Sequence, residues 1–517
     1  MKKQILLLAS LLAINVMAQN SYDPMRFVGS DLVGTARFVG MGGAMSALGT
    51  DISVISTNPA GIGLYRSNDA VVSMGLNTIG NSADFGGFTT KSDKTTFSID
   101  NAGLVLAMNP QLGPVKYVNF AVNYRRRNNL SATFGAMGSL LRQNGNETNL
   151  FSQQYALYNS YVNAGDYADY IDYKDYTSFS YPWLGLMTSE SALLDSNGNL
   201  FYVPENMDNV EGLYPTMMEY YSKEKGGVHE VDLNISANVD DKLYLGLTIG
   251  TTSVDYTRYS EYSEFDELGN NYYTIKNDYN VSGGGVNVKF GAIFRPFEYS
   301  PLKLGVAVHT PTWYSLTERT AATMICPDGY VIDTRDAYSY GDDLYVDYDY
   351  ITPWRFNLSA SYTFDKFVAV DAEYEYVDYS TAKIEYAGGG EILDMVDEVK
   401  ENMDAQHIFR VGALFNINDN FSFCCGFNHM TAPFKKEAVK AVTMFTDTKT
   451  DFVNSYETNI VTLGAGYRNK NLYLDVAYKL AMQEAEFYNY YDTDFYNPAA
   501  SVSVNRSSLV FSLGYRF

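Results

Sequence analysis

The sequence predicts an all-β membrane protein, a 14-stranded antiparallel outer-membrane β-barrel with an N-terminal plug segment inside it. Apolar and polar residues alternate through segments of about ten residues, which is the length of a transmembrane β-strand. Short turns and long loops also alternate along the chain, and the number of strands is even, as in bacterial outer-membrane barrels. Soluble β-sandwich strands also alternate, but they average about six residues. The strand length therefore favours a barrel.

Three segments show the alternation most clearly: 231–239, 354–364 and 472–480 each place an apolar residue at every second position. Such a period gives a strand one apolar and one polar face. The same pattern predicts strands at 70–80, 96–108, 116–128, 229–240, 242–255, 279–294, 302–315, 353–364, 367–379, 406–417, 420–432, 457–468, 470–481 and 506–517. The long connections follow most odd-numbered strands and cover 129–228, 256–278, 316–352, 380–405, 433–456 and 482–505. We expect these loops on the extracellular side.

Composition excludes several classes of function. The 45 Tyr and 29 Phe suit half-buried strands and membrane-interface belts. The net charge of -23 argues against a nucleic-acid partner. The three cysteines, Cys326, Cys424 and Cys425, imply no disulfide framework. With four His, no HExxH and no GxSxG, we expect no metal site, no cofactor and no enzymatic activity.

The chain is predicted to have three parts. Residues 1–18 have a basic start, an apolar stretch and a small residue at Ala18, as in a secretory signal peptide. Residues 19–69 form an N-terminal lead and plug, and 70–517 form the barrel, with a long extracellular insert at 129–228. No apolar run of about 18 residues follows the signal peptide, so no transmembrane helix is expected.

The last strand carries a second signal. Leu509, Phe511, Leu513 and Tyr515 form an apolar face that ends in the terminal Phe517. This ending resembles the assembly signal of bacterial outer-membrane barrels, so we expect the barrel-assembly machinery to recognise Phe517. An ordinary terminal strand is the alternative.

The stretch from Ala36 to Leu64 is rich in Gly and Ala and has almost no charge. Gly42 and Gly43 permit close backbone approach and positive φ. Asn58 and Pro59 form a turn signal, and proline suits the first position of a short helix. A compact segment of small residues is expected to pack inside the barrel.

Four short motifs in this stretch resemble the N-terminal hatch of the FadL family of outer-membrane transporters. They are GTAR at 34–37, MGGA at 41–44, ALGTD at 47–51 and NPAG at 58–61. The resemblance covers about thirty residues. It implies a 14-stranded barrel plugged by a hatch, and transport of long-chain fatty acids or other hydrophobic compounds such as toluene.

The resemblance also implies a route. A ligand is captured among extracellular loops, passes to a pocket near the hatch, and leaves when the hatch shifts, with lateral release into the bilayer as one option. We assign Gly42, Gly43, Asp51, Asn58, Pro59 and Ala60 to the hatch on this resemblance. Asn58 either binds strand backbones or caps a short helix.

Two sets of residues are candidates for ligand binding. Arg125 and Arg127 are predicted to point into the barrel and Arg126 outward, where they could attract a ligand carboxylate or lipopolysaccharide phosphates. A solvated cluster at the rim is the alternative. Arg319 is a second candidate for a carboxylate. In the insert, Trp183, Leu184, Leu186 and Met187 form either an apolar capture groove or the insert's own core.

Two loops or strand interruptions have alternative interpretations. Gly283, Gly284 and Gly285 mark either a kink where the wall could open or room for the plug. The acidic, Tyr-rich segment 342–350 could hold Ca²⁺, but it lacks the glycine and final glutamate of an EF-hand, so a solvated loop is expected.

Taken together, the sequence predicts a monomeric barrel in the bacterial outer membrane that takes up hydrophobic small molecules, with long-chain fatty acids as the expected ligands and aromatic hydrocarbons as the other ligand class. Outer-membrane lipid and lipopolysaccharide are its expected surroundings. The alternatives are a non-transporting surface barrel, an adhesin or structural protein that binds a partner through its long acidic loops, and a soluble β-rich binding protein.

Overall fold

The computed structural model describes residues 26–29, 31–110, 113–144, 147–163, 176, 182–203, 214–337, 343–440, 446–490 and 499–517. The predicted signal peptide, 1–18, lies outside the described residues. Within the described ranges, no helix is long and apolar enough to cross a membrane.

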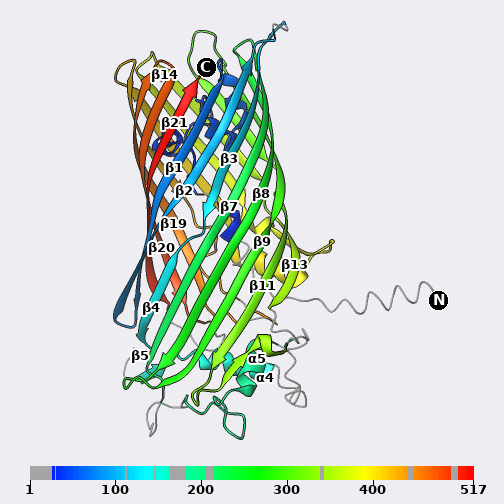
Figure 1. Ribbon diagram of the computed structural model, residues 1–517, viewed down its shortest axis with the longest axis vertical. Coiled ribbons are helices and arrows are strands. Elements are labelled where there is room, and N and C mark those ends of the chain that lie inside the picture. The colour runs from blue at the N-terminus through cyan, green and yellow to red at the C-terminus, as the bar shows by residue number, and fades with distance from the viewer. Residues whose placement is uncertain are drawn as a thin grey trace, which may run out of the picture.

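The strands form a closed antiparallel β-barrel of 14 strands (Figure 1). Neighbours around the ring pair with one another, and β1 closes the ring by pairing with β21. In order around the barrel the strands are β1 (Asp69–Phe85), β2 (Phe88–Met108), β3 (Val115–Asn129), β7 (Met217–Val239), β8 (Leu243–Phe265), β9 (Asn271–Phe294), β10 (Lys303–His309), β14 (Arg355–Phe364), β15 (Val368–Asp378), β17 (Ala405–Asn416), β18 (Phe421–Met430), β19 (Phe452–Asn469), β20 (Leu472–Tyr488) and β21 (Ala500–Arg516). The predicted strand number is confirmed, and each strand overlaps a predicted segment.

Several strands are longer than predicted, and they extend at the end of the barrel opposite the C-terminus (Figure 1). β7 begins at Met217 rather than at 229, and β8 reaches Phe265. Inward tyrosines such as Tyr256 and Tyr262 keep the period of two, so pairing continues beyond the apolar belt. The predicted strands have the length needed to cross a bilayer, but the backbone pairing between strands continues beyond that length.

Further strands lengthen the wall at the same end. They are β4 (Thr133–Ser139), which pairs with β7, β11 (Trp313–Ile325), which pairs with β9, and β13 (Leu344–Ile351), which pairs with β11. The segment 342–350 was expected to be a loop, but its residues 344–350 belong to β13, and residue 342 lies outside the described residues. Gly283–Gly285 do not open the wall either, because β9 pairs with β8 and β11 through these positions.

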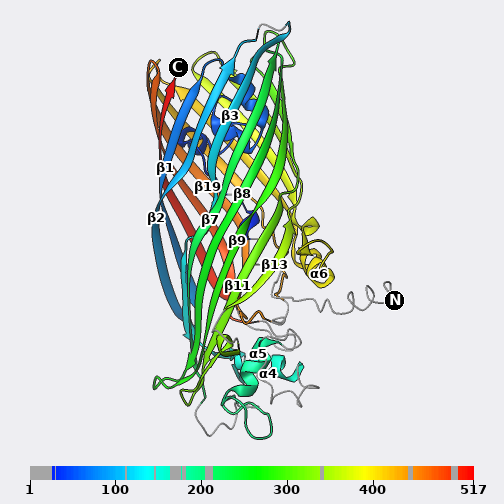
Figure 2. The same cartoon turned by 45° about the vertical axis from the view of Figure 1, so that its right-hand side comes forward.

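The remaining elements lie mainly in connections, with α4 and α5 at the far end of the barrel from the C-terminus (Figures 1 and 2). They are β5 (Leu141–Asn144), β6 (Glu147–Leu150), α4 (Gln154–Asn163), α5 (Trp183–Glu190), β12 (Val331–Asp333), η5 (Thr334–Ala337), η6 (Tyr379–Thr381), β16 (Lys383–Tyr386) and α6 (Leu393–Asn402). In its described residues, the insert predicted at 129–228 thus contains two helices and short strands, and it ends where β7 begins.

The outer face of the barrel is apolar and the lumen is polar. Leu233 and Leu358 are each 56% exposed, whereas their strand neighbours Asp232 and Asn357 are buried inside. This confirms the predicted alternation. An outward apolar belt is the arrangement that a lipid environment stabilises.

The N-terminal stretch lies inside the barrel, at the end near the C-terminus (Figure 2). It contains α3 (Ala36–Gly40), η1 (Ile52–Ser56) and η2 (Pro59–Leu64). α3 contacts β18 to β21, and η2 contacts β3 and β7 to β9, so the stretch reaches both walls of the lumen. Thr35, Asp51 and Asn58 cap the three helices by accepting backbone N–H bonds.

Small residues on both partners make this packing possible. Gly42 has φ of 67°, and a Cβ there would lie 3.0 Å from the backbone nitrogen of Phe427 in β18. On the opposite wall, a Cβ at Gly246 would overlap the backbone of Pro59. A side chain at either position would force the stretch away from the wall.

Candidate ligand-binding cavity

Asn58 joins the N-terminal stretch to the barrel wall. Its side chain is fully buried, and Oδ1 accepts a hydrogen bond from the backbone nitrogen of Ala60 at 3.1 Å. Nδ2 donates to the carbonyl oxygens of Ala292 at 3.3 Å and Val306 at 3.4 Å, in β9 and β10. Both roles considered for Asn58 are therefore present at once.

Acidic side chains also hold the N-terminal stretch in place; one belongs to the stretch itself and another to the barrel wall. Within the stretch, Asp51 accepts hydrogen bonds from Ser53 and Thr35. On β15, Asp371 accepts from the backbone nitrogens of Ala47 at 3.1 Å and Leu48 at 2.7 Å. The stretch is thus bonded to the wall through its backbone, by wall residues that the sequence pattern did not single out.

All three arginines at the end of β3 are buried inside the barrel. Arg125 pairs with Glu230 at 2.5 Å, and Arg127 donates to the carbonyl oxygen of Val28 at 3.1 Å. Arg126 pairs with Asp100 at 2.8 Å, so its predicted outward direction is wrong. The register of β3 against β7 shifts between Arg126 and Asn128, and this bulge reverses the alternation.

Two cavities lie in the lumen beside these residues. The smaller has a volume of about 60 Å³ and is lined mainly by charged and polar groups, Arg125, Arg127 and Lys289 among them. The larger has a volume of about 380 Å³. Its apolar lining includes Ile79, Phe134, Phe452, Phe487, Val502 and Val504. Polar and charged side chains make up the rest of the lining. A cavity of this size that combines an apolar wall with converging polar groups is typical of a small-molecule site.

A cluster of charges faces the larger cavity. Lys479 Nζ donates to the carbonyl oxygen of Leu32 at 3.0 Å, and Arg506 Nη1 lies 3.4 Å from the carboxylate of Asp31. Arg126 completes the cluster. The Nε atoms of Arg126 and Arg506 are buried and have no hydrogen-bond partner among the described residues.

The cluster has a surplus of positive charge. Among the described residues, the carboxylates beside Arg126, Lys479 and Arg506 are those of Asp31 and Asp100. Burial alone would raise the pKa of Asp31, but Arg506 and Lys479 outweigh it and lower the pKa, so this carboxyl is ionised at neutral pH. In a chain with a net charge of -23, this cluster is a local concentration of positive charge.

The barrel wall is weakened beside the larger cavity. β2 pairs with β3 from Asn101 to Met108. In the part of the chain that the structure describes, the other residues of β2, 88–100, form no backbone pairing with β3 or β4. Side chains bridge the break: Asn81 donates to the carbonyl oxygen of Thr133 at 2.6 Å, and Lys94 donates to that of Glu224 at 2.6 Å. Asn81 also lines the cavity, so the cavity reaches the break.

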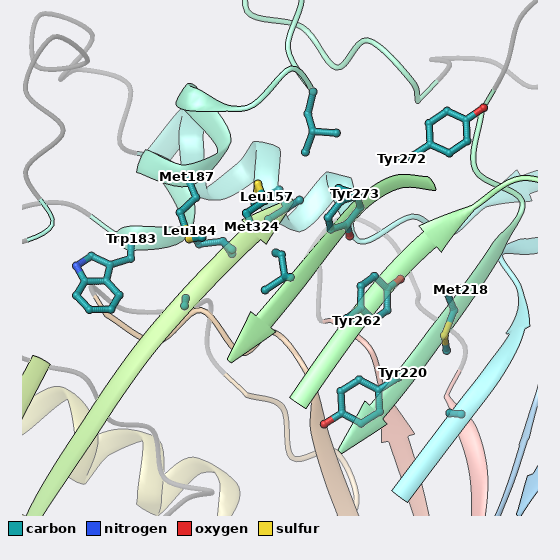
Figure 3. Close-up of a cluster of buried hydrophobic side chains, with 14 of the residues drawn as sticks. Leu157, Trp183, Leu184, Met187, Met218, Tyr220, Tyr262, Tyr272, Tyr273 and Met324 are labelled. Atoms are coloured by element: carbon teal, nitrogen blue, oxygen red, sulfur yellow. The ribbon is translucent and has the colours of Figure 1, made fainter. Parts of the chain in front are cut away.

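The apolar residues of the insert form a core. Trp183, Leu184 and Met187 in α5 are at most 1% exposed, and they pack with Leu157, Tyr273 and Met324 (Figure 3). Leu186 is 8% exposed and belongs to the same cluster. None of the four lines either cavity. The geometry favours the insert's own core over an open capture groove.

Arg319 is remote from both cavities. It is 42% exposed and pairs with Asp343 at 3.2 Å. Lys479 and Arg506, which do line the larger cavity, were not predicted. The sequence feature that could have identified them is a positive charge on the inward face of a strand with alternating residues.

No protein-family model matches the sequence, and no curated protein matches it. Solved structures do resemble the fold. A Pseudomonas aeruginosa FadL homologue superposes with a TM-score of 0.54 at 11% identity, covering 94% of this chain and 99% of the other. The P. putida toluene transporter TodX superposes with a TM-score of 0.52 at 12% identity, covering 94% and 99%. This chain therefore has the barrel fold of the FadL homologue and TodX.

Proposed function

We propose that this protein is an outer-membrane channel for hydrophobic small molecules, and that amphipathic carboxylic acids such as long-chain fatty acids are its preferred ligands. The observation that supports this proposal is the cavity of about 380 Å³, whose lining combines an apolar wall with a surplus of cationic side chains. The apolar wall matches an alkyl chain, and Arg126, Lys479 and Arg506 match a carboxylate head group. An aromatic hydrocarbon would use the apolar wall alone.

The N-terminal stretch from Gly34 to Leu64 acts as a hatch in this proposal. It fills the lumen at the end near the C-terminus, and hydrogen bonds to wall residues hold it there, those to Ala292, Val306 and Asp371 among them. Gly42, Gly43 and Pro59 place its backbone against the wall. A small shift of the hatch would open the lumen towards the periplasm.

The break between β2 and the β3–β4 edge offers a lateral exit. An alkyl chain loses stabilisation of about 0.8 kcal/mol per CH₂ when it enters water. A path from the apolar side of the cavity through the wall into the bilayer avoids that barrier. The exposed Phe97 and Ile99 on β2 place an apolar surface at the outer side of this break.

Uptake tests this function. Cells lacking the protein should take up less labelled oleate than cells that carry it, and an Arg506→Gln, Lys479→Gln variant should lose oleate uptake while it keeps toluene uptake. Fractionation and heat-modifiable gel mobility should place the folded chain in the outer membrane as a barrel. Unchanged uptake of both compounds on deletion would favour the non-transporting surface barrel.

A further inference from the structure

A short lead segment, residues 26–29 and 31–33, crosses the lumen between the two cavities. Asp31, Leu32 and Val33 line both cavities. On one side, Arg127 and Arg355 both donate to the carbonyl oxygen of Val28, at 3.1 and 3.0 Å. The lead segment therefore separates the ionic cavity from the larger one.

On the other side, cations of the larger cavity hold the same segment. Lys479 donates to the carbonyl oxygen of Leu32, and Arg506 lies 3.4 Å from Asp31. The second oxygen of the Asp31 carboxylate accepts from the backbone nitrogen of Asn129 at 3.1 Å. Lys479 and Arg506 thus have two partners that belong to the lead segment, a carbonyl oxygen and a carboxylate.

We propose that Asp31 is an internal substitute for the ligand's head group. A bound carboxylic acid replaces Asp31 at Arg506 and takes the Lys479 ammonium from Leu32, which loosens the lead segment. A neutral hydrophobic ligand occupies the apolar wall and leaves the segment in place. This inference rests on the proposed function and adds a determinant of ligand class to it.

Geometry supports the exchange. The Arg506 side chain is 40% exposed, and its contact to Asp31 at 3.4 Å is longer than the 2.7–2.9 Å of a tight charge-assisted bond. Its Nε and that of Arg126 have no hydrogen-bond partner among the described residues, so each guanidinium has donor capacity that Asp31 does not use. Arg506 can therefore exchange one carboxylate for another at little cost.

The exchange links ligand binding to the position of the lead segment. Because Asp31 and the ligand compete for Arg506, removing the hold of Asp31 raises the apparent affinity for a carboxylate by the factor by which Asp31 had lowered it. Asp31→Asn keeps the shape and an acceptor for Asn129, but it removes the charge that competes for Arg506. Asp255→Asn, at an exposed position of β8, changes the net charge equally and is the matched control.

The test measures binding of dodecanoate and of dodecanol to the purified full-length barrel in detergent. Asp31→Asn should bind dodecanoate about fivefold or more tightly than wild type, the lower end of typical coupling. Its affinity for dodecanol should be unchanged, and Asp255→Asn should match wild type for both. Equal effects on the two ligands would overturn the inference.

Hydrogen exchange supplies the second readout, because added positive charge alone would not move the lead segment. The amide of Asp31 donates to the carbonyl oxygen of Arg127 at 3.1 Å. In wild type, dodecanoate should speed exchange in residues 26–33, and dodecanol should not. If dodecanoate binds and exchange is unchanged, the inference fails while the proposed function stands. If wild type binds neither ligand, the proposed function fails, and the inference with it.

Discussion

Replacing Asn58 with alanine removes three hydrogen bonds, one within the proposed hatch and two between it and the barrel wall. The bond to the backbone nitrogen of Ala60 caps η2, and such a cap stabilises a helix by about 1 kcal/mol. The bonds to Ala292 and Val306 are long, at 3.3 and 3.4 Å, so together they add no more than about another 1 kcal/mol. The hatch should lose about 1–2 kcal/mol of docking free energy, and its opened population should rise about tenfold.

Hydrogen exchange of residues 52–64 in the purified barrel measures this opening, and labelled oleate uptake measures its consequence. Barrel assembly should be unchanged, because the strands pair through their own backbones. Asn280→Ala is the control, since Asn280 on β9 donates to the carbonyl oxygen of Tyr256 on β8 and not to the hatch. Wild-type exchange and uptake in Asn58→Ala would refute the assignment of Asn58 to the gate.

Three further perturbations have defined outcomes. Gly43→Leu should alter oleate uptake but leave heat-modifiable mobility intact, because Gly43 has φ of 80° and a Cβ there would lie 2.8 Å from Leu32. Deleting Phe517 should lower the amount of folded barrel in membrane fractions, since its backbone exchanges two hydrogen bonds with Asn68; unchanged amounts would count against the terminal signal. Glu264→Ala should release the insert to limited proteolysis, because Glu264 accepts bonds from Ser152, Gln153, Gln154 and Tyr262, and each unsatisfied buried donor costs about 1–3 kcal/mol. A protected insert would contradict it.

The strands were predictable because lipid outside and water inside impose opposite faces on every second residue. Leu233 and Asp232 show this pattern in both the sequence and the structure. The caps at Asp51 and Asn58 were also visible locally, since each acts on a backbone nitrogen two residues later. Local signals were therefore enough to predict both the barrel strands and the turns of the N-terminal stretch.

The cavity was not predictable because it depends on contacts between distant parts of the chain. Arg506 on β21 contacts Asp31, which lies 475 residues away in the sequence, and this contact forms only when the barrel is closed. The bulge near Arg126 reverses the direction of its side chain, and alternation alone cannot locate a bulge. The break beside β2 could not be predicted either. Residues 88–100 keep the alternation of a strand, but they pair with β1 on one side and not with β3 on the other.

A structure of the full-length barrel with bound dodecanoate is the decisive experiment. We expect the alkyl chain against Phe134, Phe487 and Val502, with the carboxylate at Arg506 and Lys479. An acid bound elsewhere, or a cavity that stays empty at saturating dodecanoate, would contradict it.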